Sequence, residues 1–187
     1  SMSPLPESIL LEPGEEAARL WEGAQSAHAR AGESLADLCA AIDLGIRAVE
    51  IRAVVRLQQA RDQFPATIGA QLATPDPAID PKRDATETPK VLSFVDLLDL
   101  MSGEDLGCVS LRLHTGWEDR RFSCKRSRVV AREQTGLSLD ADEREQLLRL
   151  AAYHNRIFRL PPPVLVTPGE VMGAYPALVA LYDKLSA

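Results

Sequence analysis

Residues 34–63 read SLADLCAAIDLGIRAVEIRAVVRLQQARDQ, and this stretch decides the fold. Its apolar residues recur every three or four positions, which is the spacing of one face of a helix. They are Leu35, Cys39, Ile42, Ile46, Val49, Ala53, Leu57, Ala60 and, just beyond the stretch, Phe64. The nearly heptad spacing predicts one long helix from about Ser34 to Gln63 with weak supercoiling.

A second apolar stripe widens the apolar face of this helix. It consists of Leu38, Ala41, Ala48, Ile51 and Val55. One neighbouring helix cannot cover both stripes, so the helix must pack on the rest of the chain, on a second copy or on another protein. The first alternative makes the seam an intramolecular core. Packing on a second copy or on another protein makes the seam an interface, and a second copy would give a homodimer. The candidate residues of this interface are Leu35, Ile42, Ile46, Val49 and Ala53.

The regions on either side of this helix set the domain organisation. A tail of residues 1–13 precedes a helix from about Glu15 to Ala31, which Gly32 ends, so residues 14–72 form a long helical hairpin. Residues 73–90 contain four prolines without apolar periodicity and predict an exposed linker or loop. Residues 91–187 then form a mixed region that is expected to join residues 14–72 in one compact domain.

The mixed region combines helices with one predicted β-hairpin. Thr88 and Pro89 predict the start of an apolar helix that ends at Ser102-Gly103. Residues 108–114 alternate apolar and polar, which predicts a strand, and a turn at 115–119 would lead to a return strand over 120–125.

Two helices complete the chain. Asp140 and Glu143 form a capping-box pattern before a helix over 141–159, which three prolines then stop. The sequence Thr-Pro-Gly-Glu at 167–170 starts a last helix, which is expected to break near Pro176. The predicted fold is mainly α with a minor α+β element, a helical bundle with one long helix and a single β-hairpin packed against it.

Charge is unevenly distributed along the chain. The formal net charge is −6, but residues 112–132 carry +5, which leaves −11 for the remainder. The candidate partner-binding residues are Arg112, Trp117, Arg120, Arg121, Lys125, Arg126, Arg128 and Arg132. Guanidinium groups suit carboxylates and phosphates, so the target could be an acidic segment of another protein, a nucleic-acid backbone or an anionic lipid. Alternatively, these cations pair with the acidic remainder of the chain or form a plain solvated surface.

Several functional classes lack their sequence signatures. No phosphate-binding glycine loop, dinucleotide fingerprint or serine nucleophile elbow is present. Cys108 and His114 would lie ~20 Å apart on one strand face, too far to share a zinc ion with Cys124. Cys39 falls on the core seam, where a buried inert thiol is expected. We therefore expect no catalytic residue, cofactor or metal.

The remaining features favour an interaction protein inside the cell. Three scattered cysteines are typical of a reducing compartment, and no apolar run is long enough to span a bilayer. The sequence predicts a non-enzymatic intracellular protein-protein interaction or scaffold domain, a subunit or adaptor of a larger assembly. The alternatives are a phosphate-recognising module acting through residues 112–132, or an enzyme with a site assembled from distant residues.

Overall fold

The computed structural model describes residues 2–87, 91–103 and 117–187, and for residues 117–124 it describes the backbone alone. The described α-helices are α1 (Pro13–Arg30), α2 (Leu35–Gln58), α3 (Ala66–Gln71), α4 (Pro81–Thr86), α5 (Phe94–Leu100), α6 (Trp117–Thr135), α7 (Ala141–Phe158) and α8 (Pro168–Ser186). Within these described ranges there is no β-strand, only a single bridge between Ser102 and Leu139. The prediction of a mainly α protein is confirmed.

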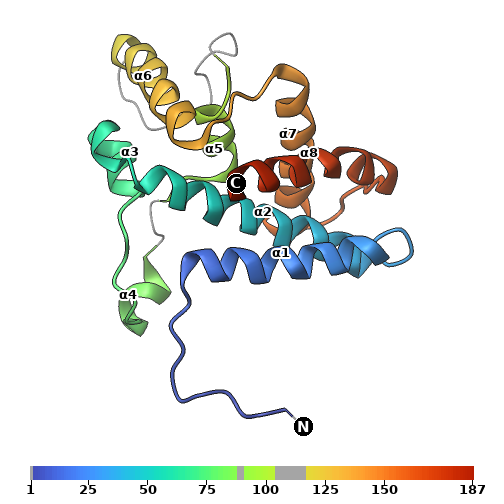
Figure 1. The fold of residues 1–187 in the computed structure, drawn as a ribbon. Helices are drawn as coiled ribbons and strands as arrows, with labels where there is room; N and C mark the ends of the chain where they lie inside the picture. The colour runs from blue at the N-terminus through green and yellow to red at the C-terminus, as the bar shows by residue number, and fades with distance from the viewer. Residues whose placement is uncertain (1, 88–90, 104–116) are drawn as a thin grey trace.

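Helices α1 and α2 form an antiparallel pair with the most extensive helix contact among the described elements (Figure 1). Helix α1 begins with Pro13, whose missing N–H costs nothing in the first turn. Helix α2 begins after Ser34, whose hydroxyl accepts a hydrogen bond from the backbone N–H of Asp37. An ion pair between Arg30 and Asp37 links the end of α1 to the start of α2.

Helix α8 covers the same central helix from another side, and it packs on α7 as well. The close approach of α8 to α2 depends on Gly45. A Cβ at this position would lie 2.8 Å from Leu178 Cδ2 of α8, which is too close for two carbon atoms. Next to this contact the Tyr175 hydroxyl donates a hydrogen bond to the Ala41 carbonyl oxygen over 3.0 Å. Helix α2 is therefore the central element, with α1 and α8 packed closely against it.

The predicted apolar seam of α2 lies in the core of this chain. Ile42, Ile46, Val49 and Ala53 are buried in one continuous hydrophobic cluster that includes residues from α1, α5, α6, α7 and α8. Their predicted role as an exposed helical interface is therefore corrected, because the chain's own helices already cover them. Only Leu35 remains exposed, with 65% of its surface accessible.

Helix α2 is shorter than predicted. It ends at Gln58 rather than near Gln63, and a 3-10 turn over Arg61–Gln63 follows. Pro65 then stands directly before the short helix α3, and Phe64 and Ile68 turn back into the core. The apolar spacing continues across the break because both segments bury side chains in the same cluster.

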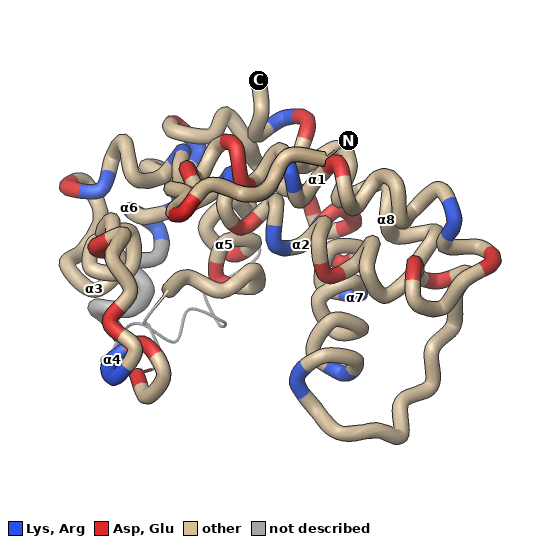
Figure 2. Tube along the Cα trace, turned by 90° about the horizontal axis from the view of Figure 1, so that it is seen from below, with Lys and Arg blue, Asp and Glu red and all other residues tan. Residues whose placement is uncertain are grey.

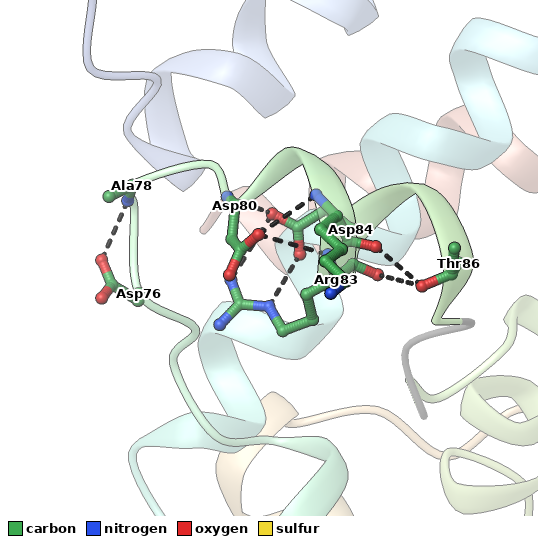
Figure 3. Close-up of polar contacts among 7 residues, drawn as sticks. Asp76, Ala78, Asp80, Arg83, Asp84 and Thr86 are labelled. Carbon is green, nitrogen blue, oxygen red and sulfur yellow. Dashed lines mark hydrogen bonds and ion pairs between the residues drawn. The ribbon is translucent and has the colours of Figure 1, made fainter.

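The proline-rich segment contains a short helix where a loop was predicted. Helix α4 is capped by Asp80, whose carboxylate accepts hydrogen bonds from the N–H groups of Lys82 and Arg83 (Figure 3). Asp84 accepts from the N–H of Asp80 and pairs with Arg83. All of α4 is exposed, and it lies at the periphery of the structure (Figure 1). Local capping, not packing, accounts for this helix.

Helix α5 begins later than the Thr88-Pro89 pattern predicted. Residues 88–90 lie outside the described part, and Val91 is exposed and non-helical. The helix is capped by Ser93, which forms a reciprocal capping box with Asp96. It then ends at Leu100, close to the predicted end at Ser102-Gly103.

The predicted β-hairpin is wrong in its second half. Residues 117–135 form α6, so the expected return strand over 120–125 is helical. The expected first strand, residues 108–114, lies outside the described residues. The basic segment from Trp117 onward is therefore a helix. Since a hairpin needs both strands, the predicted hairpin does not form.

The two C-terminal helices agree with the predictions at most positions. Asp140 and Glu143 form the predicted capping box at the start of α7. Helix α8 begins at Pro168 as expected, but it continues through Pro176 without the predicted break. The Thr167 side chain makes no capping hydrogen bond. The Tyr153 hydroxyl accepts from the Thr167 N–H instead.

Candidate functional site

The basic residues predicted to bind a partner do not form one exposed surface. Arg112 lies outside the described residues. Trp117, Arg120 and Arg121 belong to the first turns of α6, where only the backbone is described. The prediction for these four residues therefore stays a prediction.

The remaining four basic residues of α6 fall into different environments. Lys125 and Arg126 are exposed, Arg132 is half-buried, and only 2% of the Arg128 surface is accessible. The Nε–H of Arg128 donates to the backbone carbonyl of Asp99 over 3.0 Å. Arg128 is therefore part of the internal packing, and the prediction that it meets a partner at the surface is corrected.

Asp99 organises a buried ionic contact between α5, α6 and α7. Its carboxylate, with only 1% of the residue surface accessible, pairs with the guanidinium of Arg144 from α7. The Arg128 bond to the Asp99 backbone adds α6 to the same contact. These contacts join α5, α6 and α7, although Asp99 Oδ2 and Arg144 Nε are buried without a hydrogen-bond partner.

A cavity of about 470 Å³ lies between α2, α5 and α7. It is lined by Ile46, Glu50, Ser93, Phe94, Val95, Asp96, Ala151, His154, Asn155 and Arg159. Its size is within the range of sites that hold a small molecule or a side chain of a partner. Six of the lining residues are polar or charged, so the cavity is a polar pocket beside an apolar core.

Glu50 has the most unusual electrostatic environment in this pocket. Burial raises the pKa of its carboxyl from 4.5 to about 7, because the charged form loses contact with water. Arg47 and Arg159 act in the opposite direction, and Asp43 adds to the rise. Among the described residues, no hydrogen bond or ion pair reaches the Glu50 carboxylate. Near neutral pH it can therefore accept or donate a hydrogen bond.

His154 faces the pocket from α7 and is already oriented by α2. Its Nε2 lies 2.7 Å from Asp43 Oδ1, and an ionised carboxylate can only accept, so Nε2 carries the proton. The ring also contacts the Phe158 ring, with the centroids 5.2 Å apart. His154 is thus held in one orientation at the side of the pocket.

Two other polar residues of the pocket are occupied by local structure. The Ser93 hydroxyl donates to Asp96 Oδ2 and accepts from the Asp96 N–H, as part of the capping box of α5. The Ser93 N–H also donates to Asp96 Oδ2. The groups available to a ligand are therefore Glu50, Asn155 and Arg159, with the oriented imidazole of His154 beside them.

Sequence reasoning missed Glu50, although the sequence contains a signal for it. Glu50 lies four residues after Ile46 and three before Ala53, which places it inside the apolar seam. Burying an ionised carboxylate is costly, so an acidic residue at a core position is an indicator of a site. Ile46, predicted as an interface residue, lines the pocket beside it.

The thiols and metal ligands give no second site in the described part of the chain. No cluster of three or more His, Cys, Asp or Glu side chains suitable for a metal is found among these residues. Cys39 is half-buried, and burial raises the pKa of its thiol, which makes the nucleophilic thiolate rarer. Cys108 and His114 lie outside the described residues, and the side chain of Cys124 is not described.

Comparison with known protein families, with curated proteins and with solved structures finds no match. None of the helices formed by the described residues is both long enough and apolar enough to cross a bilayer. The geometry of the pocket therefore provides the basis for a functional hypothesis.

Proposed function

We propose that this chain is an interaction domain that binds another protein through the pocket between α2, α5 and α7. One observation carries the proposal: a cavity of about 470 Å³ with polar groups directed into it, including a carboxyl that has no described partner. By contrast, the buried carboxylate of Asp99 forms an ion pair with Arg144 of the same chain. An uncompensated polar group in a cavity favours a partner from outside.

The surroundings of the pocket favour a protein as the partner. Phe158, which contacts His154, and Leu160, which follows Arg159, have 46% and 53% of their surfaces accessible. Val91, two residues before Ser93, is exposed as well. Exposed large apolar side chains next to a polar pocket are typical of a protein interaction site, where one side chain of the partner enters the pocket.

The domain would act as an adaptor or as a subunit of an assembly. In Figure 2, acidic and basic residues are interspersed along the described chain, which gives a surface of mixed charge. Such a surface suits recognition of one local segment better than non-specific attachment to a polyanion. An intracellular location follows from the scattered cysteines and belongs to the same proposal.

A second candidate site is the exposed basic pair Lys125 and Arg126 on α6. The two cations are adjacent and exposed, which suits an acidic protein segment or, less favourably given the net charge, a phosphate of nucleic acid or lipid. This site would be independent of the pocket, because none of the pocket-lining residues belongs to α6.

A displayed random-peptide library tests both sites. Peptides selected on the wild-type chain should lose binding to Asn155→Trp, because Asn155 lines the pocket and is exposed enough to accept a ring that fills the pocket. The matched control is Ala152→Trp, an exposed position on α7 outside the pocket, which should bind the peptides like the wild type.

The outcomes separate the two candidates. Peptides that bind Asn155→Trp as well as they bind wild type would rule out the pocket as the binding site. If those peptides are acidic and lose binding to the double variant Lys125→Ala/Arg126→Ala, the surface of α6 is the site instead.

A further inference from the structure

We propose that the pocket between α2, α5 and α7 binds a positively charged side chain, a lysine or arginine of a basic segment in the partner protein, with the Glu50 carboxylate as its counter-ion. This inference rests on the proposed function and specifies its ligand. It follows from the position of Glu50 in the cavity, the surrounding charges and the charge of the chain.

The first step is the unmet demand of Glu50 for a partner. Its carboxyl lines the cavity and is held away from bulk water, yet no described donor is within hydrogen-bonding distance. A carboxylate in such a place gains from any cation that reaches it, because the attraction is screened less than at the surface. An ammonium or guanidinium that enters the cavity would supply both charge and N–H donors.

The second step concerns the other charges around Glu50. On α2, Asp43 is paired with His154 of α7, so this pair is already satisfied internally. On α5, Asp96 accepts hydrogen bonds from the Ser93 hydroxyl and N–H. These groups leave Glu50 as the carboxylate without a described partner among the pocket-lining residues.

Arg47 and Arg159 are the cations that oppose this proposal. Both are exposed, and neither forms a described ion pair with Glu50, although both favour its charged form at longer range. Because both side chains are exposed, water and salt screen their charges. The two arginines lower the affinity of the pocket for a cation, but they do not take the place of that cation. Neither guanidinium donates a hydrogen bond to the Glu50 carboxylate.

An anionic ligand is less well matched to the pocket. It would bring a second negative charge beside a carboxyl whose burial already disfavours ionisation, so Glu50 would first have to take up a proton. A basic partner also suits the chain as a whole, whose formal net charge is −6. Charge complementarity of this kind increases the rate and specificity of association.

The probes for the test are blocked amino acids that differ in the charge of one side chain. Nα-acetyl-lysine methylamide carries the ammonium, its Nε-acetylated form is the neutral analogue, and Nα-acetyl-glutamate methylamide carries an anion. Binding is followed by the ¹³C-methyl resonances of Ile46 and Ala151, which both line the pocket. The lysine probe should shift these resonances, and the neutral probe should bind about tenfold more weakly or not at all.

The pH dependence of binding provides the specific signature. If the ionised form of Glu50 binds the cation, affinity for the lysine probe should be about tenfold higher at pH 8 than at pH 6. Glu50→Gln keeps the size of the side chain and should abolish this dependence and weaken binding. Glu145→Gln, on the exposed surface of α7, is the matched control and should change neither.

The outcomes distinguish failure of this inference from failure of the proposed function. If none of the three probes shifts the Ile46 and Ala151 resonances, the pocket is not a binding site and both proposals fail. If the glutamate probe binds, more tightly at pH 6 than at pH 8, the pocket binds a ligand but the cationic class is wrong. A lysine probe that binds wild type and Glu50→Gln equally would also overturn the role of Glu50.

Discussion

Two acidic residues of this chain, Asp99 and Glu50, lie near the same helices in opposite situations. Asp99 is buried at the contact of α5 with α6 and α7, and its carboxylate pairs with Arg144. Glu50 lines the cavity between α2, α5 and α7 and has no described partner. The first carboxylate joins elements of the fold, whereas the second is available to a ligand.

The comparison shows that burial alone does not identify a functional carboxylate. Asp99 is the more deeply buried of the two, yet its charge is compensated within the chain. Glu50 is less buried, but no described group forms a hydrogen bond or an ion pair with it, and burial raises its pKa to about 7. The balance of burial against compensation separates a structural group from a candidate site.

The largest predicted effect comes from breaking the compensated pair. Arg144→Met should lower the free energy of unfolding by about 3–5 kcal/mol, because it leaves the Asp99 carboxylate buried without its counter-ion. Urea denaturation followed by circular dichroism measures the loss. The matched control is Arg149→Met, whose pair with Glu145 is exposed, and it should cost less than about 1 kcal/mol.

A double variant checks the cause of this loss. Asp99→Leu/Arg144→Met removes both charges, and it should recover most of the stability lost in Arg144→Met. If Arg144→Met loses no more free energy of unfolding than Arg149→Met, the buried Asp99 carboxylate does not depend on Arg144. Asp99 could then no longer be contrasted with Glu50 as a compensated carboxylate.

The next effect concerns the uncompensated carboxyl and its dependence on pH. Glu50 loses its proton near pH 4.5 in the unfolded chain and near pH 7 in the folded chain, so the folded state binds more protons between these values. Raising the pH therefore favours unfolding, and Glu50 should reduce the free energy of unfolding by up to about 3 kcal/mol between pH 4.5 and pH 8.

Glu50→Gln isolates this contribution. The variant should be as stable as wild type near pH 4.5 and more stable at pH 8, as measured by urea denaturation at each pH. If the free energies of unfolding of wild type and Glu50→Gln differ by the same amount at both pH values, Glu50 does not titrate in this range.

The smallest effect is expected at an exposed carboxylate that has an internal partner. The Tyr153 hydroxyl donates to Glu170 Oε2 over 2.6 Å and accepts from the Thr167 N–H over 3.2 Å. Tyr153→Phe should cost about 1 kcal/mol, because both bonds are made at a surface where water can replace them. Differential scanning calorimetry measures the change.

Glu170→Gln completes this third case. It keeps an acceptor for the Tyr153 hydroxyl and should cost less than Tyr153→Phe. If the amide variant proves the more costly one, the charge of Glu170 stabilises the start of α8 more than the hydroxyl contacts do.

Local signals in the sequence predicted part of the fold well. The capping box of Asp140 and Glu143, and Pro168 at the first position of α8, act through neighbouring residues, so their effect is visible in the sequence itself. The same logic applies to Ser93 and Asp96, which cap α5, whereas the Thr88-Pro89 pattern predicts an earlier start for this helix. Two competing caps in one segment cannot be ranked without knowing where the chain meets the core.

Tertiary contacts account for the remaining errors. Helix α6 is strongly polar, and alternation over residues 108–114 suggested a hairpin whose second strand the structure replaces with this helix. The seam of α2 was correctly identified as apolar, but nothing in its spacing tells whether α5, α7 and α8 or another molecule covers it. The pocket was not predictable as a site because it requires Glu50 and His154, 104 positions apart, to face one cavity.

The packing of α8 on α2 has a consequence for the order of folding. Helices α1 and α2 are joined by a short turn, whereas the Tyr175 hydroxyl meets the Ala41 carbonyl across 134 positions of sequence. Contacts between distant residues form slowly, because a long loop must close first. During synthesis on the ribosome, the α1–α2 pair would therefore emerge with the Gly45 side of α2 uncovered until the residues of α8 have been made. We expect this uncovered surface to be what a chaperone would recognise in the nascent chain.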